Sequence, residues 1–168
     1  MCIRDRHGLT VNSTDGGTLA VETEGPNSGV FMNGTALDFT GGPVNITAPK
    51  ANVQISYVGG PTNATSLNFG GGAVTIDTST TDSGATAGNI TINADVIDTP
   101  ASTVSLIATG AGNGGQINVT ATNGTLPLGT ASGTINMVAN GGSADGNGGL
   151  VFIQAHDITA ADLSLIHI

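Results

Sequence analysis

The sequence predicts an all-β protein whose strands stack in parallel as a solenoid, a parallel β-helix. Two observations lead to this prediction: a glycine-led pattern that recurs along the chain, and the near absence of good helix formers other than alanine. In the pattern, apolar residues follow the glycine two and four positions later, and Ala or Thr follows six positions later. The pattern begins at Gly17, Gly42, Gly72, Gly88, Gly115, Gly133 and Gly149.

Each copy of the pattern has the alternation expected of a strand with one buried face. Alternate side chains of a strand face opposite sides, so the two apolar positions share the inner face. The residues between them are mostly polar, as with Asn118 and Thr120. Stacked coils would place each inner Ile or Val on its counterparts and build an aliphatic core. Leu150 and Phe152 break the alternation, and we expect another segment of a longer protein to cover them.

Further strand-like segments and two polar loops lie between the repeats. Alternating or apolar segments are found at 8–12, 30–32, 36–40, 53–57, 67–69, 104–106 and 126–128. Polar loops are expected at 79–87 and 140–149. Successive repeats start 25, 30, 16, 27, 18 and 16 residues apart. Their mean of 22 lies in the range of about 20–45 residues for solenoid repeats.

An antiparallel β-sandwich is the alternative fold, because its strands carry the same alternation. Asn123-Gly124 between two short strands is a good hairpin signal. We prefer the parallel β-helix, since sandwich strands have no reason to share a glycine-led register. Parallel contacts among Ile92, Val119 and Met137 would favour the helix, and antiparallel contacts across Asn123-Gly124 would favour the sandwich.

The two ends of the chain have an unusual origin. The DNA that encodes the first and last six residues can be written as two reverse-complementary strings, which resemble a transposon end used in sequencing adapters. We therefore expect residues 1–6 and 163–168 to be adapter translation, and residues 7–162 to be a β-solenoid fragment of a longer chain. Within 7–162, Lys50 is then the single Lys or Arg, and the one cysteine, Cys2, is excluded.

Composition argues against several classes of partner. The chain has a formal net charge of −9 with three Lys and Arg residues. Nucleic acid and anionic lipid both require basic clusters, so we predict neither as a partner. No run of eighteen apolar residues is present, so we predict no membrane insertion in this stretch. An acidic chain rich in Asn and Thr is typical of a bacterial extracellular protein that is stable without disulfides.

The repeats resemble those of a known class of proteins. Segments 88–94 (GNITINA) and 133–139 (GTINMVA) are similar to repeats of filamentous-haemagglutinin-type adhesins and other large bacterial surface proteins. The resemblance covers nearly all of 14–160 and implies a right-handed parallel β-helix, secretion and adhesion. We therefore expect a structural or adhesive segment of a large protein that is extracellular or at the cell surface, associated with the outer membrane, and that acts as a stiff stalk displaying loops. Its expected partner is a glycan or the surface of a host or neighbouring cell.

Catalysis is the competing function, because β-helices also carry pectin-degrading enzymes. Such sites need Asp or Glu beside Lys, Arg or His. Asp95 and Asp98 are three residues apart, but at a strand end exposed turn carboxylates are expected. His156 and Asp157 are adjacent, so in a strand they would face opposite sides. We predict no enzyme and no catalytic residues. The alternative is a non-catalytic part of a carbohydrate-active β-helix enzyme.

A glycine-rich segment raises the question of calcium. Residues 141–149, with Asp145, resemble the glycine-aspartate nonapeptide of calcium-binding β-rolls. The segment has one Asp and no tandem copy, so we interpret it as a glycine-rich turn. No metal ligand, cofactor-binding residue or cofactor is predicted.

Overall fold

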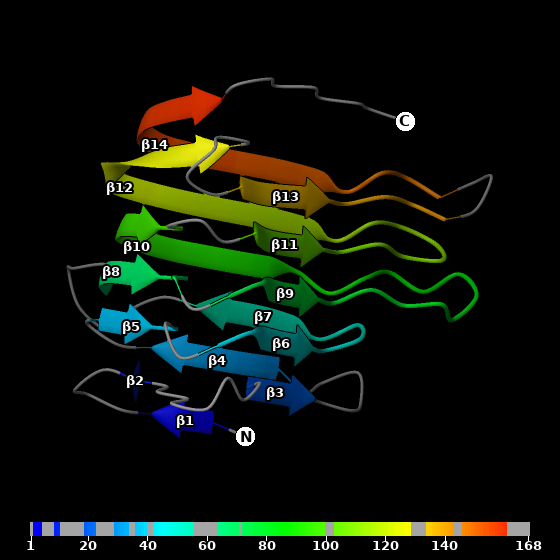
Figure 1. The fold of residues 1–168 in the computed structure, drawn as a ribbon. Coiled ribbons are helices and arrows are strands. Elements are labelled where there is room, and N and C mark those ends of the chain that lie inside the picture. The colour runs from blue at the N-terminus through cyan, green and yellow to red at the C-terminus, as the bar shows by residue number, and fades with distance from the viewer. Residues whose placement is uncertain are drawn as a thin grey trace.

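The structure, a computed structural model, is built of β-strands in all of its described parts (Figure 1). It describes residues 2–4, 9–10, 19–22, 29–33, 36–39, 42–55, 64–70, 72–99, 103–128, 134–142 and 146–160. No helix in these ranges is long and apolar enough to span a membrane.

The described residues form fourteen strands, which follow one another along the chain. They are β1 (Cys2–Arg4), β2 (Leu9–Thr10), β3 (Leu19–Glu22), β4 (Gly29–Asn33), β5 (Ala36–Asp38), β6 (Val44–Thr47), β7 (Asn52–Ile55), β8 (Ala64–Asn68), β9 (Val74–Asp77), β10 (Ile90–Asp98), β11 (Thr103–Ile107), β12 (Gln116–Leu128), β13 (Thr134–Val138) and β14 (Leu150–Ala160). β1 falls within residues 1–6, whose adapter origin stays a prediction, and 163–168 lie outside the described residues.

The strands form two sheets, and every strand pairing in the described residues is parallel. The larger sheet has nine strands in the order β1-β4-β7-β10-β8-β5-β2, with β12 and β14 following beside β10. The smaller sheet has five strands in the order β13-β11-β9-β6-β3. The antiparallel sandwich is therefore wrong. Asn123 and Gly124 do not form a hairpin but lie inside β12, at an irregularity in its pairing with β14.

The larger sheet folds around a corner within its long strands. The first part of β10 pairs with β7, where Ile90 is opposite Val53. The second part pairs with β8, where Ile97 is opposite Leu67. The chain runs along one half of the larger sheet, then the other half, then the smaller sheet, and returns one level higher (Figure 1). We call each such circuit a coil.

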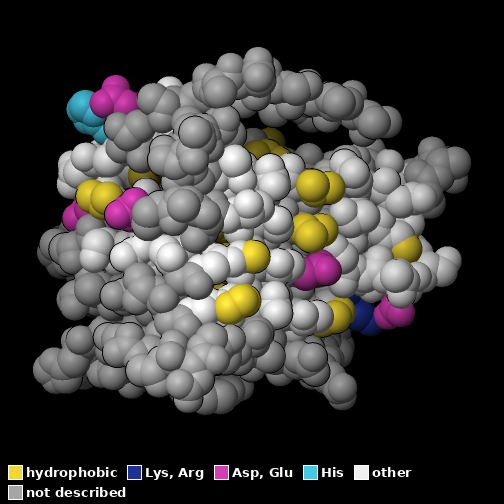
Figure 2. Space-filling model, in the orientation of Figure 1, with side chains coloured by type: hydrophobic (Ala, Val, Ile, Leu, Met, Phe, Trp, Pro, Cys, Tyr) yellow, Lys and Arg dark blue, Asp and Glu magenta, His cyan; other side chains and the backbone are white. Residues whose placement is uncertain are grey.

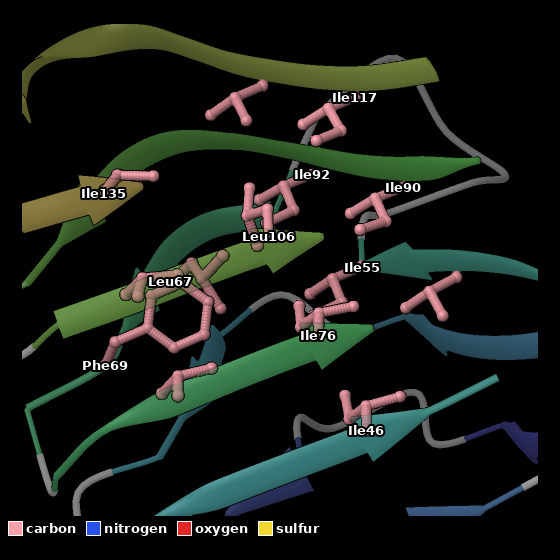
Figure 3. Packing of buried hydrophobic residues seen from close by; sticks show 14 of the residues in the cluster. Ile46, Ile55, Leu67, Phe69, Ile76, Ile90, Ile92, Leu106, Ile117 and Ile135 are labelled. Atoms are coloured by element: carbon pink, nitrogen blue, oxygen red, sulfur yellow. The ribbon is translucent and has the colours of Figure 1, made fainter. Parts of the chain in front are cut away.

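Aliphatic side chains from successive coils stack between the sheets and form the core. In the smaller sheet Ile46, Ile76 and Leu106 are in register and each is 0% exposed. Figure 3 shows such side chains converging from both sheets. Phe39 and Phe69 stack with ring centroids 5.6 Å apart. Because burial of one such side chain contributes about 1.5–3 kcal/mol, repetition along the coils supplies the stability.

The glycine-led repeats do not all occupy equivalent places. Four of them lead into strands of the smaller sheet, namely β3, β6, β9 and β13, and the other three lead into β10, β12 and β14 of the larger sheet. Successive strands of the smaller sheet are offset by 25, 30, 30 and 31 residues. The irregular steps in the sequence thus arise from two interleaved series.

This division corrects one expected set of contacts. Ile92 is opposite Val119, as predicted for a parallel stack. Met137 instead pairs with Leu106 in the smaller sheet, so its placement beside Val119 was wrong. The local alternation is the same in both series, and therefore cannot specify which sheet a repeat joins.

The leading glycine has a different role in each sheet. In the smaller sheet Gly42 and Gly72 have positive φ values of 155° and 154°, a conformation that glycine favours. In the larger sheet the reason is close backbone approach. A Cβ on Gly115 would lie 2.0 Å from the carbonyl oxygen of Gly88, and one on Gly149 would lie 1.9 Å from that of Gly115. We call Gly88, Gly115 and Gly149 the glycine column.

The last coil is less buried than those below it. The outward-facing Leu150 and Phe152 are 52% and 49% exposed. Their inward neighbours Val151 and Ile153 pack against the core but are only partly buried.

Ala48 and Ala94 each follow the leading glycine of their repeat by six residues. They are 0% exposed where their strands end or bend, as expected of a small residue at a tight corner.

Candidate functional site: the stacked loops

The connections from the smaller to the larger sheet project on one side of the molecule (Figure 1). The first of these connections, at 48–51, is short. The next three, at 78–88, 108–115 and 139–149, are longer, and residues 143–145 lie outside the described residues. We call these three longer connections the loop stack. The predicted loops 79–87 and 140–149 both belong to it.

Each loop is closed at its base by one backbone hydrogen bond. These bonds run from Gly88 N to Thr78 O (3.1 Å), from Gly115 N to Ala108 O (2.9 Å) and from Gly149 N to Ala139 O (2.7 Å). At the first base the Thr78 hydroxyl also donates to the carbonyl oxygen of Gly88 at 2.8 Å. Each loop therefore leaves the core through a narrow neck at the same place in its coil.

The loops bond to one another above these necks. Thr80, Gly110 and Gly141 form successive parallel bridges, so the ladder of the smaller sheet continues into the loops. Two further backbone bonds join the loops, since Gly112 N donates to Ala85 O at 2.9 Å and Gly142 N donates to Gly112 O at 3.1 Å. The loop stack is therefore a continuation of the coils and not a set of separate loops.

Asn113 in the middle loop binds both neighbouring loops. Its Oδ1 accepts a hydrogen bond from Asn147 N at 3.0 Å, and its Nδ2 donates to Thr86 Oγ1 at 3.4 Å. Its carbonyl oxygen accepts from Ala87 N at 3.1 Å. One amide side chain thus ties the middle loop to the loop below and the loop above.

Charge is sparse on the loop stack. Lys50, in the short connection, forms an ion pair with Asp82 in the loop above, and their side chains are 35% and 62% exposed. Figure 2 shows one basic side chain against an acidic one at the edge of the molecule, with acidic and hydrophobic side chains otherwise scattered over this face. The loop stack chiefly presents backbone groups, hydroxyls and amides.

The two carboxylates weighed as a catalytic pair lie on β10, around the corner of the larger sheet. Asp95 is half-buried and accepts a hydrogen bond of 2.6 Å from the Thr122 hydroxyl. Asp98 is exposed. Neither forms an ion pair with a described basic residue. In the described ranges the structure therefore pairs no cation with either carboxylate.

His156 and Asp157 both lie at the surface, but their side chains do not face opposite sides as strand alternation would place them. His156 Nδ1 lies 3.1 Å from Asp157 Oδ2. The two residues sit where β14 turns the corner, and the alternation stops there, since Ile158 is exposed as well. The exposed fractions of the two side chains are 69% and 67%, so this is a surface pair.

Metal ligands do not gather anywhere in the described ranges. No group of three or more His, Cys, Asp or Glu side chains is close enough there to hold an ion. Asp145, the acidic residue of the glycine-rich segment, lies outside the described residues.

Sequence reasoning missed that the loops stack and that 108–115 joins the other two. A signal was present in the spacing. Thr80, Gly110 and Gly141 are 30 and 31 residues apart, the same offsets that separate the strands of the smaller sheet. Comparisons with models of known protein families, with curated proteins and with solved structures find no match, so the loop stack is interpreted from its own geometry.

Proposed function

We propose that this chain is a structural or adhesive repeat segment of a large bacterial protein that is secreted or held at the cell surface. In this proposal the coils form a right-handed parallel β-helix that acts as a stiff stalk, and the loop stack is the surface that it displays. The observation that carries the proposal is the unbroken parallel register from β3 to β13, which continues outward into the loops.

Stiffness follows from the direction of the hydrogen bonds. In a stack of parallel strands they run along the long axis, and each coil adds about 4.8 Å to the length. The core beneath them is continuous, with Val53, Ile90 and Ile117 between 0% and 1% exposed. Bending such a stalk would open both the ladder and the core.

The proposed partner is a neutral glycan on a cell surface. The loop stack supports this choice, because most of its exposed polar side chains are amides and hydroxyls without charge. They include Thr81, Ser83, Thr86, Asn113, Asn140 and Asn147. Such groups donate and accept hydrogen bonds, which is what sugar hydroxyls require.

Adhesion is tested with beads that carry the chain and glass that carries neutral glycans. We expect bead retention to fall when the exposed Thr81 and Thr86 of the loop stack are both changed to Asp. The matched control changes two exposed residues elsewhere, Asn45 and Thr47, to Asp on the outer face of the smaller sheet. Equal retention by all three proteins would remove the loop stack from adhesion, and no retention by any of them would overturn the adhesive function.

The stalk is tested by pulling single molecules at their two ends. We expect stepwise lengthening by about 100 Å per coil, because Val44 and Val74 in successive coils are 30 residues apart and an extended residue spans about 3.3–3.6 Å. A single unfolding step without substeps would contradict coil-by-coil resistance.

A longer reading of the gene would distinguish the stalk from the alternative, a non-catalytic part of a carbohydrate-active β-helix enzyme. Further glycine-led repeats would favour the stalk, and a cluster of Asp with Arg or Lys would favour the enzyme.

A further inference from the structure

β12 carries two extra residues where the larger sheet turns its corner. Between residues 121 and 125, both of which pair with β14, β12 has three residues, and β14 has only His156 over the same span. The pairing of β12 with β10 ends at residue 121. Neither Asn123 nor Gly124 is therefore opposite a residue in either ladder. Such a bulge leaves its extra residues unpaired and disrupts the ladder locally.

The corner holds this bulge at both ends and leaves its middle free. Before it, the Thr122 hydroxyl donates to Asp95 Oδ1 at 2.6 Å. After it, Leu126 is 0% exposed. Between these anchors Asn123 is exposed, and a Cβ on Gly124 would meet nothing closer than 3.4 Å. Among the described residues the Asn123 side chain has no hydrogen-bond partner. Because β12 lies between β10 and β14, this freedom belongs to the middle of the stack.

An asparagine followed by glycine is the pair in which the main chain most readily attacks the side chain. The glycine nitrogen bonds to Cγ of the asparagine and gives up its proton to the solvent, the bond from Cγ to Nδ2 breaks, and ammonia leaves. The product is a succinimide ring, which water then opens at either carbonyl to give aspartate or isoaspartate. Glycine favours the attack, because it has no Cβ and its backbone rotates freely. An unpaired, exposed bulge gives the backbone room for that rotation.

A second Asn-Gly pair, in the loop stack, is held in place. The side-chain amide of Asn113 is bonded at both of its ends, to Asn147 N and to Thr86 Oγ1. Gly114 N, the atom that would attack, donates to Asn147 O at 3.0 Å. Ring closure at Asn113 therefore has to break bonds to both neighbouring loops, whereas at Asn123 it breaks none that the structure describes.

We propose that Asn123 is a site of spontaneous modification, at which the folded protein converts the amide to aspartate or isoaspartate through a succinimide, and that Asn113 is protected from the same reaction. The conversion adds a negative charge close to Asp95 and, as isoaspartate, one carbon to the main chain. The corner therefore becomes more acidic with the age of the molecule. It lies on the opposite side of the molecule from the loop stack, so the inference is independent of the proposed stalk and its glycan (Figure 1).

The test follows both pairs in the folded chain over weeks at neutral pH. Samples are denatured and digested, and mass spectrometry measures the loss of each amide, while an isoaspartyl methyltransferase with a labelled methyl donor measures isoaspartate. We expect Asn123 to convert at least about tenfold faster than Asn113, because the hydrogen bonds of the second pair raise its barrier. In urea, where these bonds are lost, the two rates should become nearly equal.

Two variants assign the reaction to the corner. Gly124→Ala has room for its methyl group and places it beside the attacking nitrogen, so conversion at Asn123 should slow at least about tenfold. Asn123→Gln keeps the glycine and should remove the isoaspartate label from this site. Both variants should keep the β circular dichroism of the unmodified chain. If Gly124→Ala fails to fold, Asn123→Gln and the comparison with urea still decide the proposal.

Two results would overturn the proposal. Equal rates at Asn123 and Asn113 in the folded chain, with equal acceleration of both in urea, would show that the corner protects its pair as well as the loops protect theirs. An unchanged rate at Asn123 in Gly124→Ala would show that the amide is lost by direct hydrolysis and not through the ring. Neither result would bear on bead retention or on the pulling experiment, so the proposed function would stand or fall separately.

Discussion

β12 and β14 have nearly the same sequence pattern and very different surroundings. Ile117 and Val119 on β12 are each 0% exposed, because β10 lies on one side and β14 on the other. Val151 and Ile153 occupy the same positions of β14 and are only partly buried. Burial in this protein is therefore conferred by the next coil and not by the pattern of the strand itself.

The difference has a consequence for how stability is distributed. An inner residue of a middle coil has partners above and below, whereas an inner residue of the last coil has partners among the described residues on one side only. The same truncation should therefore destabilise the two levels unequally. Four measurements would test whether stability differs between parts of the molecule in this way.

The largest contrast is expected between Ile117→Ala and Ile153→Ala. The first leaves a cavity in a fully packed core and should lower the free energy of unfolding by about 4 kcal/mol. The second should lower it by about 1 kcal/mol, because half of its contacts are already absent. Urea denaturation measures both. Equal losses would mean that β14 is covered in solution.

Substitution of a residue in the glycine column should destabilise the protein nearly as much as Ile117→Ala. Substitution of a glycine at the corner should have a much smaller effect. Gly115→Ala places a Cβ 2.0 Å from a backbone oxygen, and the shift of the coil should cost about 3 kcal/mol. Gly124→Ala meets nothing closer than 3.4 Å and should cost less than about 1 kcal/mol. Thermal unfolding of the pair checks this. A mild effect at Gly115 would show that neighbouring coils can move apart.

One change in the middle of the stack should stabilise the protein. The buried hydroxyl of Thr99 has no hydrogen-bond partner among the residues that the structure describes, and the residue is 1% exposed. Thr99→Val removes this unsatisfied group at nearly constant volume and should raise the free energy of unfolding by about 1 kcal/mol. The same exchange at the exposed Thr103 is the control and should have little effect. A loss of stability in Thr99→Val would point to a bound water at that hydroxyl.

The smallest effect is expected outside the core, at the ion pair of Lys50 and Asp82. Both side chains are partly exposed, so Asp82→Asn should cost no more than about 0.5 kcal/mol. The difference from the unmodified chain should disappear at 1 M salt, where charges are screened within about 3 Å. A difference that persists at high salt would mean that Asp82 positions its loop by contacts other than charge.

The sequence could predict which residues face inward, because alternation is a local property. Of the strand predicted at 53–57, residues 53–55 lie in β7, and 56–57 lie outside the described residues. The inward positions of β7 and the pairing of Ile92 with Val119 follow from this alternation. It could not predict that Met137 belongs to the other sheet, because both series carry the same pattern and the choice depends on the length of the connections between them.

Contacts at corners and in loops could not be predicted from alternation, because alternation holds only along straight strands. The rule that neighbouring residues face opposite sides fails where a strand bends, and His156 and Asp157 therefore come into contact. The bridge between Gly110 and Gly141 joins loops that carry no apolar alternation. Only the constant offset between coils could have revealed it.

The glycine column also bears on how a gene of this kind could grow. A coil inserted above Gly88 must bring a residue without a Cβ at that position, because the carbonyl oxygen beneath it occupies the space. Tandem duplication of one coil supplies such a residue automatically, since the copy carries its own glycine. Lengthening by duplication would then need no compensating substitution, whereas a coil recruited from an unrelated gene would have to acquire its glycine first.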